Sequence, residues 1–219
     1  MTRKTKRAAA RLILIVCLLL MGCMAAGIAL DTMVTVPDIT LFRGTNNTLI
    51  VRIAEKRIPT RELRKESEYR DEFAARLEEA TAVFDYERIQ VEINSSGGSV
   101  QAARGIAKAL AERKEYKHFV IDGECGSSMV QLLALGRPDY ISMTARSVII
   151  LHEQRNLYTW NKLGNNADEI AGIMQLTGQD EATVRAWFTG SGANEWTQFK
   201  RAQARKAGFL GAKSWEVEP

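Results

Sequence analysis

Short strand patterns alternate with helical patterns through the middle of the chain. The segment RIQVEI, residues 88–93, places Ile, Val and Ile at every second position, which is typical of a strand with one buried face. A helical pattern follows over Val100–Leu110, and the next strand pattern is HFVID, residues 118–122. Strand–helix–strand units with short connections normally pair their strands in parallel through right-handed crossovers. The alternation therefore predicts an α/β fold built on a parallel sheet.

The same patterns extend in both directions from this unit. Asp, Pro, Gly and Asn in residues 31–47 predict a linker, and TLIVRI at 48–53 predicts a strand. Within residues 60–84, apolar residues recur at helical spacing, which predicts a long amphipathic helix with a solvated charged face. Further on we expect a helix over 127–135, strands over 140–143 and 147–151, and helices over 167–176, 181–188 and 194–206. One α/β domain over 48–215 is the resulting prediction.

The first 30 residues have the composition of an export segment. Five Lys and Arg residues precede residue 12, and the 19 residues Leu12–Leu30 carry no charge. A helix of this length reaches across a bilayer, and the positive flank predicts that the rest of the chain is exported. A signal peptide cleaved at the small-x-small site Gly27-Ile28-Ala29 is an alternative, and lipidation at Cys23 is a third.

The charge balance and the glycosylation motifs indicate which partners and which cellular location to expect. Without the five N-terminal positives, 25 Lys and Arg face 26 Asp and Glu, with no basic stripe, so we expect no nucleic-acid partner. Formal N-glycosylation acceptors occur at Asn46 and Asn94, the second beside a glycine turn, which favours a bacterial cell. We therefore expect a single-pass inner-membrane protein with a periplasmic domain, or a protein secreted to the periplasm.

Cysteine and histidine are scarce. Cys125 is the one cysteine beyond the apolar segment, so we expect no disulfide in the domain and a small buried role for this residue. The two histidines, His118 and His152, do not have the spacing of metal ligands, and we expect no metal and no cofactor.

A pair of glycines, Gly97 and Gly98, stands between a predicted strand and a predicted helix. Glycine permits backbone conformations and close approaches that other residues do not. The unpaired N–H groups at the start of a helix add a partial positive charge. The turn is either a tight strand-to-helix connection or a cradle for an anion such as an oxyanion.

A serine cluster in GECGSSM follows the next strand, again where a helix begins. A serine there is either a helix cap or a hydroxyl held for chemistry, and a nucleophilic hydroxyl needs a base. His152 follows the strand pattern SVIIL and is either a structural histidine or that base.

Together these segments resemble a known family. INSSGGSV, GSSMVQLLALG and ARSVIILHE are similar to the proteolytic subunit of Clp proteases, in the Clp/crotonase fold superfamily. The later LTGQDEATV and ARKAGFLGA resemble the segments that follow in that family. The resemblance covers about residues 88–185, and more loosely up to 212. It implies a ββα superhelix with a parallel sheet, preceded here by an N-terminal hydrophobic helix.

The resemblance also implies site residues. It places the nucleophile on Ser127, the general base on His152, and the oxyanion donors on the backbone N–H groups of Gly98 and Ser128. The reaction implied is peptide-bond hydrolysis through a covalent acyl intermediate, with peptides or unfolded proteins as substrates. A homo-oligomer is a further expectation.

Two departures from the family pattern concern the third catalytic residue and the assembly. The family's triad aspartate falls on Trp187, which cannot accept a hydrogen bond from imidazole. Asn194 and Glu195 lie just beyond and are candidate substitutes, whereas Asp180 is expected to cap the following helix. The segment between His152 and residue 177 is shorter than in the family, which there places the helix that joins two rings.

Three functions remain open at this point. The first is an ATP-independent serine peptidase that faces the extracytoplasmic space. The second is a non-catalytic scaffold or peptide-binding protein that keeps the fold and lacks the triad aspartate. A crotonase-like thioester enzyme is the third, and no acyl-CoA signature in the sequence supports it.

Overall fold

The computed structural model describes residues 33–135, 140–155, 166–190 and 196–211. The predicted export segment, residues 1–30, lies outside these ranges, and so do Asn194 and Glu195. No helix within the described ranges has the length and apolar composition needed to cross a membrane.

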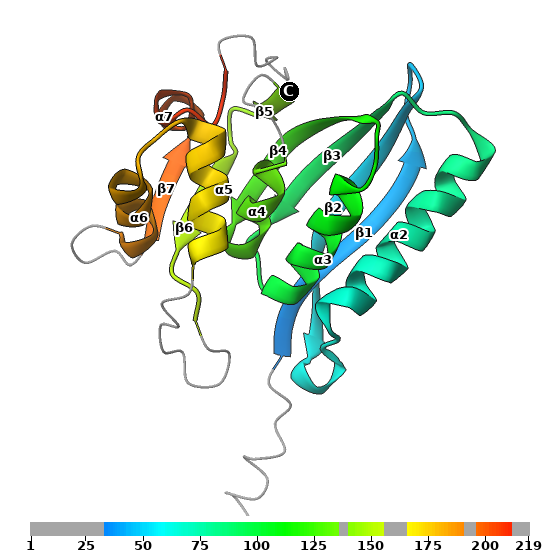
Figure 1. Cartoon of the computed structure of the whole chain (residues 1–219), viewed down its shortest axis with the longest axis horizontal. Coiled ribbons are helices and arrows are strands. Elements are labelled where there is room, and N and C mark those ends of the chain that lie inside the picture. The colour runs from blue at the N-terminus through cyan, green and yellow to red at the C-terminus, as the bar shows by residue number, and fades with distance from the viewer. Residues whose placement is uncertain (1–32, 136–139, 156–165, 191–195, 212–219) are drawn as a thin grey trace, which may run out of the picture.

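One seven-stranded sheet organises the described chain (Figure 1). Its path is β1-β2-β3-β4-β6-β7, and β5 pairs with β4 off this path. The central pairs β2–β3, β3–β4, β4–β5 and β4–β6 are parallel, as the strand–helix alternation predicts, while β1 and β7 add antiparallel edges. The strands are β1 (Met33–Arg43), β2 (Thr48–Pro59), β3 (Arg88–Ser95), β4 (Tyr116–Gly126), β5 (Ile141–Met143), β6 (Val148–His152) and β7 (Trp196–Lys200).

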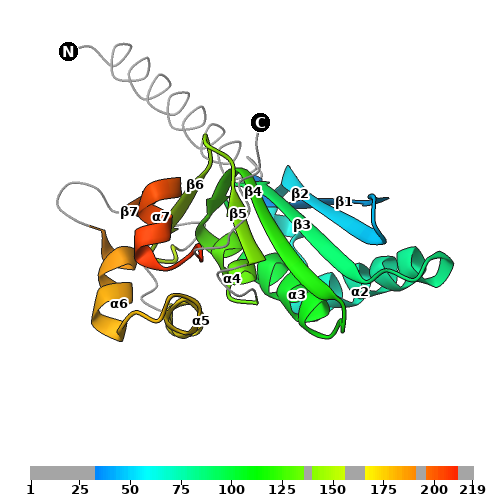
Figure 2. The same ribbon diagram turned by 90° about the horizontal axis from the view of Figure 1, so that it is seen from above.

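The helices α2, α3, α4 and α5 lie on one side of the sheet (Figure 2). Alternate residues of β3 point toward them: Ile89, Val91 and Ile93 are fully buried. On the helical side, α3 contributes a buried stripe that includes Ile106 and Leu110. The helices are α2 (Glu66–Val83), α3 (Val100–Ala111), α4 (Val130–Leu133), α5 (Ala167–Thr177), α6 (Glu181–Thr189) and α7 (Arg201–Ala207).

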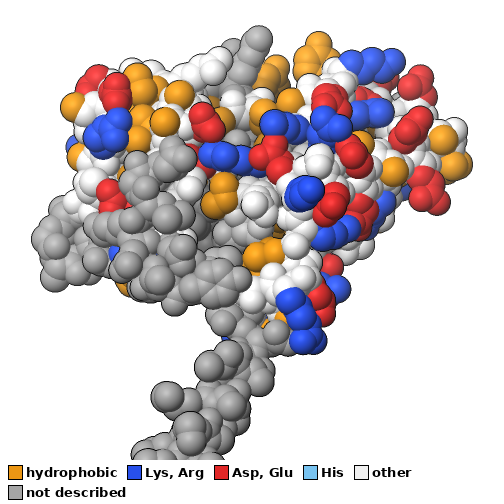
Figure 3. Space-filling view, turned by 60° about the horizontal axis from the view of Figure 1, so that its bottom comes forward, with side chains coloured by type: hydrophobic (Ala, Val, Ile, Leu, Met, Phe, Trp, Pro, Cys, Tyr) orange, Lys and Arg blue, Asp and Glu red, His pale blue; other side chains and the backbone are white. Residues whose placement is uncertain are grey.

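The long charged helix is shorter than its pattern predicts. A 3-10 turn, Thr60–Glu62, precedes α2, which then begins at Glu66. Tyr69, Phe73 and Leu77 are its buried residues. Lys and Arg side chains are intermixed with Asp and Glu over the face shown in Figure 3. This mixture of signs fits the expectation of a solvated face on the charged segment.

The prediction of a linker over residues 31–47 is wrong, because β1 occupies most of this stretch. It pairs antiparallel with β2 along its whole length, from Met33 opposite Pro59 to Arg43 opposite Leu49. Pro37 does not prevent strand formation here, because β1 is an edge strand and proline is tolerated where one side is free of ladder hydrogen bonds. The turn residues are real but confined to 44–47, where Asn46 and Asn47 have positive φ.

The prediction of a helix over 194–206 is also wrong in its first half. Residues 196–200 form β7, which pairs antiparallel with β6, and only Arg201–Ala207 is helical. Tertiary contact decides this, because the ring centroid of Phe199 lies 5.0 Å from that of Trp187 and 5.3 Å from that of Phe209.

The predicted cap of the helix that follows Asp180, α6, is confirmed. The carboxylate of Asp180 accepts a hydrogen bond from the Thr183 N–H, which lowers the pKa of Asp180.

Candidate active site

Sheet register brings two chemically active residues to the same edge. Gly126, the last residue of β4, pairs with Ile150 on the parallel neighbour β6. Ser127 comes one residue after this pair, and His152 comes two residues after it. Adjacent strands lie about 4.8 Å apart, so the serine and the histidine leave the sheet side by side.

The glycine turn packs directly against the serine. A register shift between Ile93 and Ser95 ends the regular β3–β4 pairing and leaves the turn beside the end of β4. A Cβ on Gly97 would lie 2.5 Å from the Ser127 Cβ, and a Cβ on Gly126 would lie 2.6 Å from the Ser96 carbonyl oxygen. Close approach therefore requires glycine at both positions.

Ser127 stands in an uncommon backbone conformation. Its φ is +51°, in the left-handed region that side-chain-bearing residues rarely adopt. Strained residues of this kind concentrate at functional sites, because the surrounding structure has to hold them there. Ser128 follows at the start of a short 3-10 turn, Ser127–Met129, and its side chain is buried. The structure thus presents the Ser127 hydroxyl rather than that of Ser128 to the surface.

A cavity of about 300 Å³ joins these groups. Ser127, His152 and Gly98 all line it, together with residues from β1 and from the end of β2. Ser128 lies just behind the wall: its backbone nitrogen is 3.2 Å from the point where a Cβ on Gly97 would lie. The Gly98 N–H has no acceptor among the described residues. The structure therefore brings together the four groups predicted from the sequence.

The imidazole of His152 has a fixed contact at Nδ1. This nitrogen lies 2.7 Å from the main-chain carbonyl oxygen of Glu153. A carbonyl oxygen accepts only, so Nδ1 is the donor and carries the proton in the neutral ring. The lone pair is then on Nε2, which is the form that a general base needs.

At the position of the family's aspartate, Trp187 is partly buried and packs against the hydrophobic core. Trp187 makes an edge contact with Phe199 at 5.0 Å and lies 5.8 Å from Phe209. The three rings contact one another, and Phe199 belongs to β7, whose Trp196 pairs with His152 across the sheet. Asn194 and Glu195, the candidate substitutes, fall outside the described residues.

A polar network that was not predicted from the sequence joins the chain after His152 to α5 and α3. The backbone N–H of Gln154 donates to Asn166 Oδ1 at 3.2 Å, and its side-chain amide donates to Glu169 Oε1 at 2.7 Å. Arg104 of α3 pairs with the same Glu169 oxygen at 3.3 Å and with Asp168 at 3.0 Å. Acidic residues in the first turn of a helix are commonly explained by the helix dipole alone, and only the burial of Glu169 and its contacts with Gln154 and Arg104 reveal the network.

Cys125, next to the site, behaves as a buried core residue. Its side chain is fully buried, as the sequence predicts, and burial raises the pKa of its thiol far above the ordinary value. We expect iodoacetamide to leave Cys125 unmodified in the native protein at pH 8 and to modify it fully in denaturant. Peptide mass spectrometry checks this, and rapid native modification of Cys125 would contradict the buried assignment.

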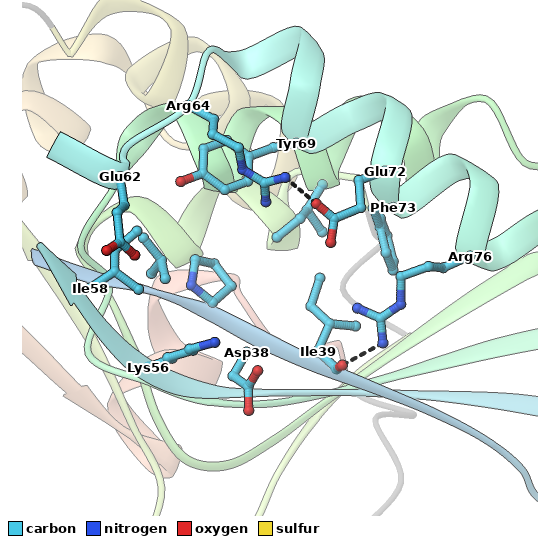
Figure 4. A pocket seen from close by; sticks show the side chains of 13 residues that line it. Asp38, Ile39, Lys56, Ile58, Glu62, Arg64, Tyr69, Glu72, Phe73 and Arg76 are labelled. Atoms are coloured by element: carbon cyan, nitrogen blue, oxygen red, sulfur yellow. Dashed lines mark hydrogen bonds and ion pairs between the residues drawn. The ribbon is translucent and has the colours of Figure 1, made fainter. Parts of the chain in front are cut away.

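A second cavity, of about 370 Å³, lies between the β1–β2 hairpin and α2 (Figure 4). Its wall carries charged groups of both signs, including an ion pair between Arg64 and Glu72, and Arg76 donates to the Ile39 carbonyl oxygen at 2.6 Å. None of the described residues that line this wall is a serine, cysteine or histidine. The candidate catalytic groups therefore belong to the smaller cavity.

Comparison with known proteins gives the fold. No family model and no curated protein matches the sequence. Among solved structures, a mutant ClpP1 from Listeria monocytogenes is similar with a TM-score of 0.52 at 16% identity, covering 66% of this chain and 82% of that one. A structure described as a peptidase from Plasmodium falciparum is similar with a TM-score of 0.52 at 14% identity, covering 70% of this chain and 89% of the other.

These likenesses define the fold of the described chain. The described chain has the Clp protease-like α/β fold, as the sequence motifs predict. At such low identity the likeness extends to the fold alone.

Proposed function

We propose that this protein is an ATP-independent serine peptidase that cleaves peptides or unfolded proteins. The observation that carries the proposal is the shared cavity of Ser127, His152 and Gly98, with the serine held at positive φ. A hydroxyl, a basic nitrogen and an open N–H donor around one space are the parts that acyl transfer requires. The name of one structural neighbour, a peptidase from Plasmodium falciparum, agrees with this assignment.

In the proposed reaction, the Ser127 Oγ attacks the carbonyl carbon of the peptide bond while His152 Nε2 takes the hydroxyl proton. The N–H groups of Gly98 and Ser128 hold the oxyanion of the tetrahedral intermediate. His152 then gives its proton to the leaving amine, and the C–N bond breaks. A water molecule, deprotonated by the same nitrogen, hydrolyses the acyl-serine and restores the enzyme.

The contact of His152 with the Glu153 carbonyl bears on how fast this enzyme would hydrolyse peptides. A carbonyl oxygen fixes the same tautomer as a triad carboxylate does, but it is neutral and stabilises the imidazolium less. The peptidase is therefore expected to be slower than one with a carboxylate in this place. The packing of Trp187 against Phe199, at the position where the family has its aspartate, supports the alternative function, a peptide-binding scaffold without turnover.

The location of the enzyme rests on the sequence of the first 30 residues. Their positive charges and uncharged stretch support an inner-membrane anchor with the catalytic domain in the periplasm, or secretion to the periplasm. The proposed partners are the membrane, through this segment, the peptide substrate and further copies of the chain.

Labelling with a fluorophosphonate probe tests the proposal, because such probes react with activated serines. We expect the wild-type protein to be labelled at Ser127 and Ser127→Ala to show no labelling. Ser128→Ala is the matched control: its hydroxyl is buried, so the variant keeps both the nucleophile and the backbone donor. A folded wild-type protein that is not labelled would exclude the peptidase and leave the scaffold function.

A further inference from the structure

We propose that the cavity beside Ser127 selects peptides that carry a carboxylate close to the scissile bond. The inference rests on the proposed peptidase function and names its substrate class. Neither the sequence motifs nor the structural neighbours indicate a preference of this kind. It comes from the charges that the fold gathers on the cavity wall.

The described residues of the wall carry one sign of charge. Arg57 and Arg155 are the charged residues among them, and no described aspartate or glutamate lines the cavity. The remaining wall is apolar or neutral, with Met33, Val34 and Val100 among the contributors. A guanidinium facing a confined, partly apolar space favours a planar anion, and carboxylate is the anion that peptides provide.

Arg57 reaches the cavity because the β1–β2 hairpin extends past the rest of the sheet. The β2–β3 pairing ends at Ile53, whereas the β1–β2 pairing continues to Pro59, with Arg57 opposite Thr35. The Thr35 carbonyl oxygen accepts from the Ser99 N–H at 2.9 Å, immediately beside Gly98. The hairpin end is thus fastened to the glycine turn, and Arg57 stands next to the candidate oxyanion donors.

One carboxylate near this face is already engaged. Glu55, two residues before Arg57 on β2, accepts a hydrogen bond from the Ser96 N–H in the glycine turn. Arg57 itself is exposed, and no described carboxylate forms an ion pair with it. Its charge is therefore available to a substrate.

Protection of Ser127 from the fluorophosphonate probe measures the preference directly and needs no turnover. The full chain is labelled in the presence of peptides blocked at both ends that contain Glu or Gln at the same position. A second pair carries either a free C-terminal carboxylate or a C-terminal amide. A side-chain carboxylate and a chain-terminal carboxylate could both bind Arg57. Comparison of the two peptide pairs shows which of them the cavity prefers.

We expect the carboxylate peptide of at least one pair to protect Ser127 roughly 5- to 10-fold better than its neutral partner at low salt. The difference shrinks as salt screens an exposed charge. Arg57→Glu is expected to abolish it. Arg57→Gln is a milder variant that keeps the assay usable should the charge reversal disturb folding.

Lys56→Glu is the matched control. Lys56 is the adjacent residue on β2, so its variant has the same net charge as Arg57→Glu, but it lines the cavity of Figure 4 instead. Its preference for carboxylates is expected to equal that of the wild type.

Three results would overturn the inference. Equal protection by both members of each pair, with Ser127 still labelled, removes the substrate class and leaves the peptidase function standing. An equal loss of preference in Lys56→Glu shows that net charge, not the position of Arg57, is responsible. Absence of labelling in the wild-type protein removes the peptidase function and the inference with it.

Discussion

Replacement of Gly98 by alanine is expected to lower the free energy of unfolding by about 3 kcal/mol or more. Two causes act together. The φ of Gly98 is +117°, which an L side chain rarely adopts, and an added Cβ would lie 2.1 Å from the Thr35 carbonyl oxygen. Backbone cannot yield as the end of a flexible side chain does, so β1 must separate from the glycine turn. Urea unfolding followed by circular dichroism measures the loss.

Gly178→Ala separates the two causes. Gly178 also has a positive φ, +72°, but an added Cβ would meet nothing within 4 Å. This variant carries strain without a clash and is expected to lose only about 1–2 kcal/mol. Equal losses for Gly98→Ala and Gly178→Ala would show that the contact between Gly98 and Thr35 is not formed as the structure has it.

The second large effect concerns the two histidines. His152→Ala is expected to slow fluorophosphonate labelling of Ser127 by about 10²- to 10⁴-fold, because a serine hydroxyl without a base is a poor nucleophile. The half-buried imidazole is not part of the apolar core, so the variant should remain folded.

His118→Ala is the control for this variant. His118 lies near the start of β4 and contacts the Ser142 hydroxyl at 3.0 Å, at the opposite end of the sheet from His152. Burial, with a smaller effect of Arg88, lowers the pKa of His118, so it is neutral at pH 7. Its loss should leave the labelling rate unchanged. Comparable rates for His152→Ala and the wild type, with both folded, would exclude His152 as the base.

Much of the central fold follows from local sequence. The alternation of Ile89, Val91 and Ile93 predicts a half-buried strand, and all three are buried. A period of two or of 3.6 is a property of the chain itself, so it can be recognised without knowledge of any neighbour. The roles of the candidate site residues were predicted from the resemblance to the Clp protease proteolytic subunit, and local pattern contributed only that the glycine, serine and histidine motifs each follow a strand.

Tertiary structure alone decided the edges of the sheet and the surroundings of the site. Residues 33–43 form a strand because β2 offers an open edge, and residues 196–200 form one because β6 does. Neither segment has a pattern strong enough to specify a strand by itself. The acceptor for His152 Nδ1, the place of Trp187 and the approach of Arg57 to Ser127 likewise depend on distant segments. Local sequence determines which way each strand faces, but only packing determines what stands opposite it, because contacts across a sheet join residues far apart in the chain.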